Sequence, residues 1–158
     1  MALQSEPLNV HERMVDREGR PSRSFIAWLT QLTDTVASAP LQLQTLSLTG
    51  QTAALGTTPI LTATVADGLY RVTWAARVTT VAVTSSSLTV TLSWTDGGVA
   101  CSQAFAAMTG NTTATVGSGT VLVRSDTASP ISIATAYASN GAAEMAYSLH
   151  GVVEQVAA

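Results

Sequence analysis

The residues that could carry chemistry are few in this sequence and stand far apart. There are two histidines, His11 and His150, and one cysteine, Cys101. A nucleophile needs a base close to it, and no histidine falls in the predicted hairpin that contains Cys101. No group of His, Cys and Asp residues has the spacing of metal ligands. We therefore predict no catalytic residues, no metal site and no cofactor.

Three aspartates stand beside turn signals rather than together. Asp67 lies in "ADG", Asp96 in "TDGG" and Asp126 in "SDT". A short acidic side chain in such a place caps or bends the chain. The alternative is a calcium site at one end of the fold, which would require several of these oxygens to converge. A turn-capping role is the simpler interpretation.

Trp94 and Arg77 are the candidate ligand-binding residues, because a tryptophan beside an arginine can bind a sugar. Trp94 lies near the tip of a predicted hairpin and Arg77 in another predicted strand. The alternation of polar and apolar residues assigns Trp94 to the core and Arg77 to an outward face. A sugar site would require Trp94 to be exposed.

The composition excludes several classes of partner. The chain has 158 residues, of which 46% are hydrophobic and only 11% charged, and its formal net charge is −3. No basic stripe exists to hold nucleic acid through its phosphates. Thr and Ser interrupt every hydrophobic run before it reaches the roughly 18–20 residues that span a bilayer. The first residues, "MALQSEPLNVHER", lack the pattern of a secretory signal.

Residues 1–40 are predicted to form an N-terminal arm followed by one short helix. Residues 1–20 lack apolar periodicity and are expected to be extended. Pro21 and Ser22 suit a helix start, and "ASAP" at 37–40 ends the helix. One face of this helix carries Phe25, Trp28, Leu29, Leu32 and Val36. A helix of about four turns is marginal alone, so we expect it to dock onto a partner.

From Leu41 onward the hydrophobic period changes from 3.6 to 2, which indicates β-strands. The stretch 69–80 alternates cleanly, and 88–105 reads as a hairpin that turns at 96–98. The leucines of 41–48 shift phase, as at a bulge. "GSG" at 117–119 is predicted as a turn between two strands. About eight or nine strands without helical crossovers predict that 41–158 is an antiparallel, jelly-roll-like β-sandwich.

The outward faces of these strands predict self-association. They are rich in Thr and Ser and nearly free of charge. Isolated sheets usually protect themselves with Lys or Glu, so faces of this kind are expected to be covered by other copies in a closed symmetric oligomer. A homotrimer is the preferred copy number, although the residues do not separate it from other closed rings.

The stretch "VDREGRPSRSFIAWLTQL", residues 15–32, resembles a short N-terminal module of tailed-bacteriophage virion proteins. The pattern is V-D-x-x-G-x-P-S-x-x-F-x-x-W-L, and the matching positions are Val15, Asp16, Gly19, Pro21, Phe25, Trp28 and Leu29. The sandwich stretches are similar in texture to other phage structural proteins. The resemblance implies a non-enzymatic virion protein, a fibre-like or spike-like homotrimer made in the host cytoplasm and mounted on the collar, tail or capsid. The residues expected to contact other virion proteins are Val15, Asp16, Arg17, Arg20, Phe25, Trp28, Leu29 and Leu32.

Three alternatives to this function differ in what the sandwich would contact. The first is a decoration or cement protein that stabilises contacts between capsid subunits. The second is an adhesin that binds a host surface glycan through Trp94 and Arg77. The third and weakest is a polysaccharide hydrolase, which would require paired acids in a groove.

Overall fold

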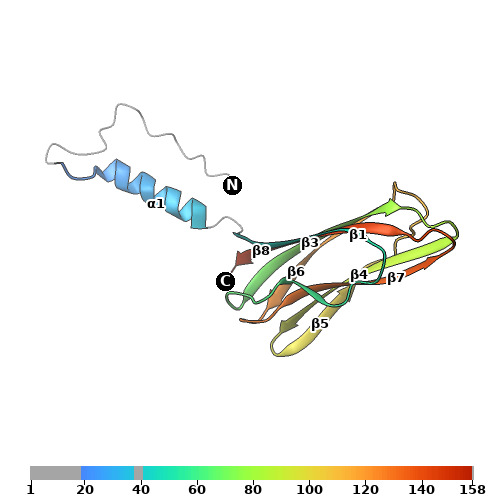
Figure 1. Cartoon of the computed structure of the whole chain (residues 1–158). Coiled ribbons are helices and arrows are strands. Elements are labelled where there is room, and N and C mark those ends of the chain that lie inside the picture. The colour runs from blue at the N-terminus through green and yellow to red at the C-terminus, as the bar shows by residue number, and fades with distance from the viewer. Residues whose placement is uncertain (1–18, 38–40, 158) are drawn as a thin grey trace. The chain divides into compact units, whose positions relative to one another are not determined.

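The computed structural model describes residues 19–37 and 41–157, and it divides the chain into two compact units (Figure 1). Unit 1 is Met1–Ala39 and unit 2 is Pro40–Ala158; among the described residues, the one helix lies in unit 1 and all the strands lie in unit 2. The protein is therefore mainly β, as the periodicity of the sequence predicts.

The helix α1 spans Arg23–Ala37. The Oγ of Ser22 accepts a hydrogen bond of 3.2 Å from the backbone N–H of Phe25, which satisfies one of the free donors of the first turn. The helix ends at Ala37, where the sequence predicts its end. The rings of Phe25 and Trp28 stack with their centroids 6.0 Å apart, so the predicted aromatic face of this helix is present.

Unit 2 consists of eight strands in two four-stranded antiparallel sheets (Figure 1). One sheet has the order β1-β8-β3-β6 and the other has the order β2-β7-β4-β5. The pairs β1–β8, β2–β7, β3–β6 and β4–β5 form one long antiparallel ribbon that folds over on itself, which is the jelly-roll arrangement. The strands are β1 Leu41–Gln51, β2 Thr58–Leu61, β3 Gly68–Thr80, β4 Ser85–Asp96, β5 Val99–Ala104, β6 Val116–Ser125, β7 Ile131–Asn140 and β8 Ala146–Ala157.

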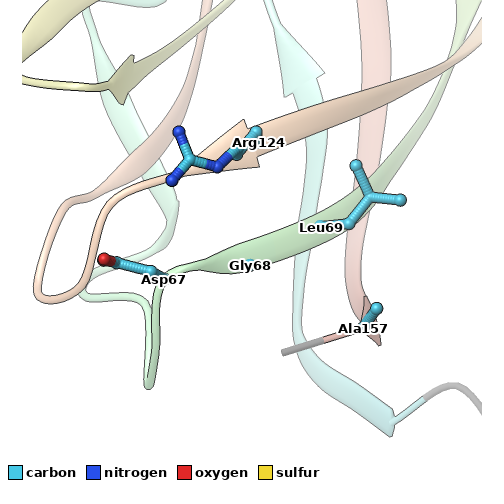
Figure 2. A pocket seen from close by; sticks show the side chains of 5 residues that line it. All are labelled: Asp67, Gly68, Leu69, Arg124 and Ala157. Atoms are coloured by element: carbon cyan, nitrogen blue, oxygen red, sulfur yellow. The ribbon is translucent and has the colours of Figure 1, made fainter.

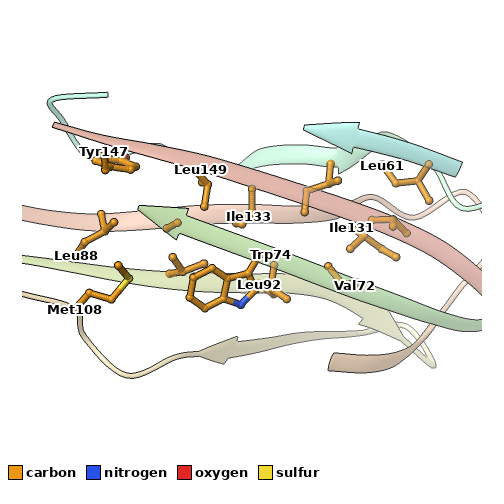
Figure 3. Close-up of a cluster of buried hydrophobic side chains, with 14 of the residues drawn as sticks. Leu61, Val72, Trp74, Leu88, Leu92, Met108, Ile131, Ile133, Tyr147 and Leu149 are labelled. Atoms are coloured by element: carbon orange, nitrogen blue, oxygen red, sulfur yellow. The ribbon is translucent and has the colours of Figure 1, made fainter. Parts of the chain in front are cut away.

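The predicted alternation is confirmed in β3 and β4. The even-numbered apolar residues 70–78 of β3 and 88–92 of β4 are buried, while the odd-numbered residues between them face outward. Side chains from the two sheets meet in one core between the layers (Figure 3). The residues that are completely buried there include Tyr70, Leu88, Ile133 and Leu149.

The predicted bulge and hairpin turn are also present. The register of β1 against β8 shifts between Gln42 and Gln44, so Leu43 and the later leucines of β1 still pack against the core. Asp96 pairs with Val99, and the two residues between them are glycines with positive φ. A two-residue turn of this hand fits the twist of the flanking strands.

Two features of the sheet differ from the prediction. "GSG" at 117–119 is not a turn, because β6 passes through it and pairs continuously with β3. A Cβ on Gly117 would lie 2.3 Å from the sulfur of Met108, so these glycines make room for side chains from the segment after β5. The short strand β2 has no counterpart in the prediction. Pro59 lies in it, and with only four residues it shows no readable alternation.

Candidate interaction surfaces

The helix presents part of the predicted virion-contacting set. Phe25 and Trp28 are partly buried, Leu29 is 41% exposed, and Arg20 lies exposed just before the helix. Leu32 lies within α1. Val15, Asp16 and Arg17 fall outside the described residues. The described part of unit 1 is therefore a short amphipathic helix with large apolar side chains still accessible at its surface.

The structure does not bring Trp94 and Arg77 together. Trp94 belongs to β4 and is partly buried, with its side chain packed against the core. Arg77 belongs to β3 in the other sheet and faces outward. The Trp94 side chain points into the core from the second sheet, and the Arg77 side chain points outward from the first sheet. The two side chains therefore form no common binding surface.

Asp126 is the capping residue of one end of the sandwich. Its two carboxylate oxygens accept hydrogen bonds from the backbone N–H groups of Gly97 (2.8 Å) and Gly98 (2.7 Å). The loop after β6 thereby holds the β4–β5 turn. The buried Thr64 hydroxyl donates to the backbone carbonyl of Asp126 and accepts from the N–H of Ser129, which attaches the β2–β3 loop to the same network.

The other two turn aspartates lie at the same end and are also engaged. Oδ1 of Asp67 accepts a hydrogen bond of 2.5 Å from the backbone N–H of Thr127. That hydrogen bond, with a smaller contribution from the positive charge of Arg124, holds the pKa of Asp67 below its ordinary value of 3.8. Asp96 forms an ion pair with Arg124, with 2.9 Å between Oδ1 and Nη1. The turn-capping interpretation is confirmed for Asp67 and Asp126, which accept hydrogen bonds from backbone N–H groups, whereas Asp96 pairs with Arg124.

A shallow pocket of about 290 Å³ lies beside this network (Figure 2). Its lining is Asp67, Gly68, Leu69, Arg124 and Ala157, which come from the adjacent ends of β3, β6 and β8. The pocket is open to solvent and contains one carboxylate and one guanidinium. Its lining contains no nucleophile and one acid, Asp67, so these residues offer no general acid–base pair.

The described residues contain no group of three or more His, Cys, Asp or Glu side chains that could hold a metal ion. The three aspartates lie at the same end of the sandwich, but their carboxylate oxygens do not converge on one point where an ion could bind. Each carboxylate binds a backbone N–H or an arginine instead. The calcium alternative therefore finds no ligand set in this part of the chain.

His150 faces outward from the middle of the first sheet. Its Nδ1 lies 3.1 Å from the Oγ of Ser47 on the neighbouring strand β1. Arg71 and Glu154 form an ion pair on the same face, with 2.7 Å between Nε and Oε2. The face is otherwise built from residues such as Thr73 and Thr120, whose hydroxyl oxygens lie 3.1 Å apart. Polar side chains here bind each other across strands.

The outward face of the second sheet is composed of small neutral residues. In β4 and β7 these positions alternate with inward-facing residues, and the corresponding positions of β5 pair with those of β4 in register. They carry no charge and no large side chain. They are Ser87, Thr89, Thr91, Ser93, Thr95, Ala100, Ser102, Ala104, Ala134, Ala136 and Ala138. A sheet face without charges or large side chains can approach another surface closely.

Within the described ranges, no helix has the length and apolar character that a membrane span requires. The described residues thus present one amphipathic helix and a jelly roll whose second sheet has a neutral outward face, whereas the first sheet carries charged side chains such as Arg71 and Glu154. No protein-family model matches the sequence, and no curated protein matches it either.

Proposed function

We propose that this protein is a non-enzymatic structural component of a bacteriophage virion. In this proposal it forms a homotrimeric projection on the collar, tail or capsid, and it is attached to other virion proteins through its N-terminal arm and helix. The jelly-roll unit is the part that projects. The observation that carries the proposal is the division of the chain into two compact units, one a β-sandwich and the other containing an amphipathic helix.

The helix supports an attachment role because its apolar side chains gain free energy when they are covered. Ile26 is 50% exposed and Leu29 is 41% exposed, while the neighbouring aromatic pair is only partly buried. Burial of apolar surface contributes about 25 cal/mol per Å², so a few such side chains supply several kcal/mol in a complex. Several copies of the helix in one oligomer would strengthen attachment through avidity.

The sandwich supports a structural rather than an enzymatic role. Its carboxylates at the loop-rich end are engaged by backbone N–H groups and Arg124. Its outward histidine, His150, lies 3.1 Å from the hydroxyl oxygen of Ser47. The neutral outward face of its second sheet suits close packing against another copy or another virion protein, because little charge has to be desolvated.

The test is incorporation into particles by phage that encode altered forms of this protein. Deletion of residues 1–36 should leave a folded sandwich that no longer joins the virion. The full-length variant Trp28→Ala should reduce incorporation, because it removes the largest apolar side chain of the helix face. Thr30→Ala is the matched control on another side of the helix. If the truncated protein incorporates normally, the attachment proposal is wrong.

A decoration or cement protein is the second candidate, and the neutral face of the second sheet favours it. Such a face could lie against capsid subunits over a broad area. Particles that lack the protein would then lose resistance to heat while they still adsorb to cells. The glycan-binding alternative gains nothing from Trp94 and Arg77, since they lie on different sheets and face different ways.

A further inference from the structure

The four edge strands of the sandwich differ in how well they are protected against pairing with another chain. An edge strand exposes unpaired N–H and C=O groups, and proteins blunt such edges with bulges, prolines, charges or shortness. Strand β1 has two register irregularities against β8. Strand β2 has four residues and contains Pro59. Strand β5 has six residues. Three of the four edges are thus short or irregular.

Strand β6 has no bulge and no proline, and it is not short. It is ten residues long and pairs with β3 without any register shift, from Gly68 opposite Ser125 to Arg77 opposite Val116. Its sequence, "VGSGTVLVRS", contains no proline and one charged residue, Arg124. In the described part of the chain it pairs with β3 alone, so its other edge is unpaired.

The side chains along β6 also favour a partner. On its inner face, Gly117 and Gly119 leave space that Met108 and Phe105 fill. On its outer face, Val116 is 62% exposed and Leu122 is 55% exposed. An edge that combines unpaired backbone groups with exposed apolar side chains is suited to strand addition.

We propose that β6 pairs antiparallel with β6 of a second copy of this chain, so that two four-stranded sheets join into one. The pairing is centred on Thr120, which then lies opposite Thr120 of the second copy. Ser118 lies opposite Leu122, and Val116 lies opposite Arg124. Each outward residue thus faces an outward residue, as antiparallel pairing about a central residue requires.

The charge distribution favours this occupant and this register. The two copies of Arg124 lie at opposite ends of the joined ribbon, about 26 Å apart at roughly 3.3 Å per residue. Arg124 is already paired with Asp96 of its own chain. No like charges therefore meet along the contact, and the aliphatic part of Arg124 can cover the exposed Val116 of the other copy.

This inference rests on the proposed self-association and adds a two-fold contact to it. Pairing of β6 joins copies two at a time, so it would link subunits of neighbouring trimers. The two proposals are separable, because a trimer needs no β6 contact and a β6 pair needs no trimer.

The experiment measures the assembly state of the full-length chain by sedimentation velocity over a range of concentrations. Thr120→Lys and Thr120→Glu each place like charges directly opposite one another at the two-fold axis. Each variant alone should raise the dissociation constant of the pair about tenfold. An equimolar mixture of the two should restore association, because Lys then faces Glu. Thr45→Lys, at an exposed position of the β1 edge, is the matched control and should change nothing.

Circular dichroism and urea unfolding should show that the variants are folded. A second measurement is independent of charge: Thr120→Cys in a Cys101→Ser chain should form an intermolecular disulfide on mild oxidation, because residues opposite each other on antiparallel strands lie within bonding reach. The inference is overturned if Thr120→Lys assembles like the unaltered chain or if the mixture fails to restore association. Trimers that survive in Thr120→Lys, with no larger assembly in the unaltered chain, would leave the proposed function standing and refute the β6 contact.

Discussion

One buried hydroxyl group connects the two sheets and gives the sharpest test of the packing. Tyr147 of β8 belongs to the first sheet and is completely buried. Its hydroxyl lies 2.8 Å from the Oγ1 of Thr135 on β7, in the second sheet, and 3.0 Å from the carbonyl oxygen of Ala53. Thr135 also accepts a hydrogen bond of 2.8 Å from the N–H of Leu55. This small network joins both layers to the β1–β2 connection.

Tyr147→Phe removes the hydroxyl and keeps the ring. A buried hydrogen bond contributes about 1 kcal/mol net, and a buried partner left without one costs more. The Tyr147 hydroxyl takes part in two contacts, so we expect the free energy of unfolding to fall by about 2 kcal/mol. Thr135→Val should cost a similar amount. The double variant should be less destabilised than the sum by about 1 kcal/mol, because both changes remove the same bond.

Urea unfolding followed by tryptophan fluorescence measures these differences. With a slope of about 2 kcal/mol per M, the midpoint of Tyr147→Phe should shift down by about 1 M. An unchanged midpoint would show that the hydroxyl contributes nothing to the folded state. Additive single variants would show that Tyr147 and Thr135 do not interact, and the reasoning that joins the two sheets through this network would be wrong.

Three further predictions concern the loops and β6. Gly119→Ala should lower the free energy of unfolding by about 1–3 kcal/mol, because the new methyl carbon would lie 2.7 Å from the indole nitrogen of the buried Trp74. Gly56→Ala is the neutral control in the same urea assay, because a Cβ at Gly56 would meet no other atom within 4 Å. Asp126→Ala should cost about 1 kcal/mol and increase hydrogen exchange in the β4–β5 turn, whose two N–H groups lose their acceptor. A hydrogen bond from a backbone N–H lowers the pKa of Asp67, so the stabilising effect of the ionised carboxylate is present above pH 3.8 and is lost as the pH falls through the lowered pKa. The stability of Asp67→Asn should therefore depend less on pH in the acid range. Identical acid unfolding curves for the variant and the unaltered chain would refute this.

Much of the fold follows from local periodicity. The alternation in β3 and β4 predicts which side chains are buried, because successive residues of a strand face opposite sides. The glycine pair after Asp96 predicts a tight hairpin, because both turn residues need positive φ. Ser22 predicts the start of the helix because its hydroxyl can cap the first turn. All these features depend on residues that are neighbours in the sequence.

The features that the sequence does not predict depend on residues far apart in the chain. "GSG" is a turn signal by composition, yet the glycines of β6 are needed because Met108 and Phe105 occupy the space beside them. The contact between Asp126 and the β4–β5 turn likewise joins segments about thirty residues apart. A local pattern identifies Asp126 as a capping residue but cannot identify the turn that it caps.

The low charge of the chain bears on how its sheets avoid unwanted pairing. A chain in which only 11% of all residues are charged cannot protect all the edges of its sandwich with lysine and glutamate. The bulges of β1, the proline of β2 and the shortness of β5 provide protection through backbone geometry instead. Strand β6 combines the longest regular register among these edges with exposed Val116 and Leu122. Because the other three edges are blunted, an unprotected fourth edge is best explained by a partner strand that covers it in the assembled state.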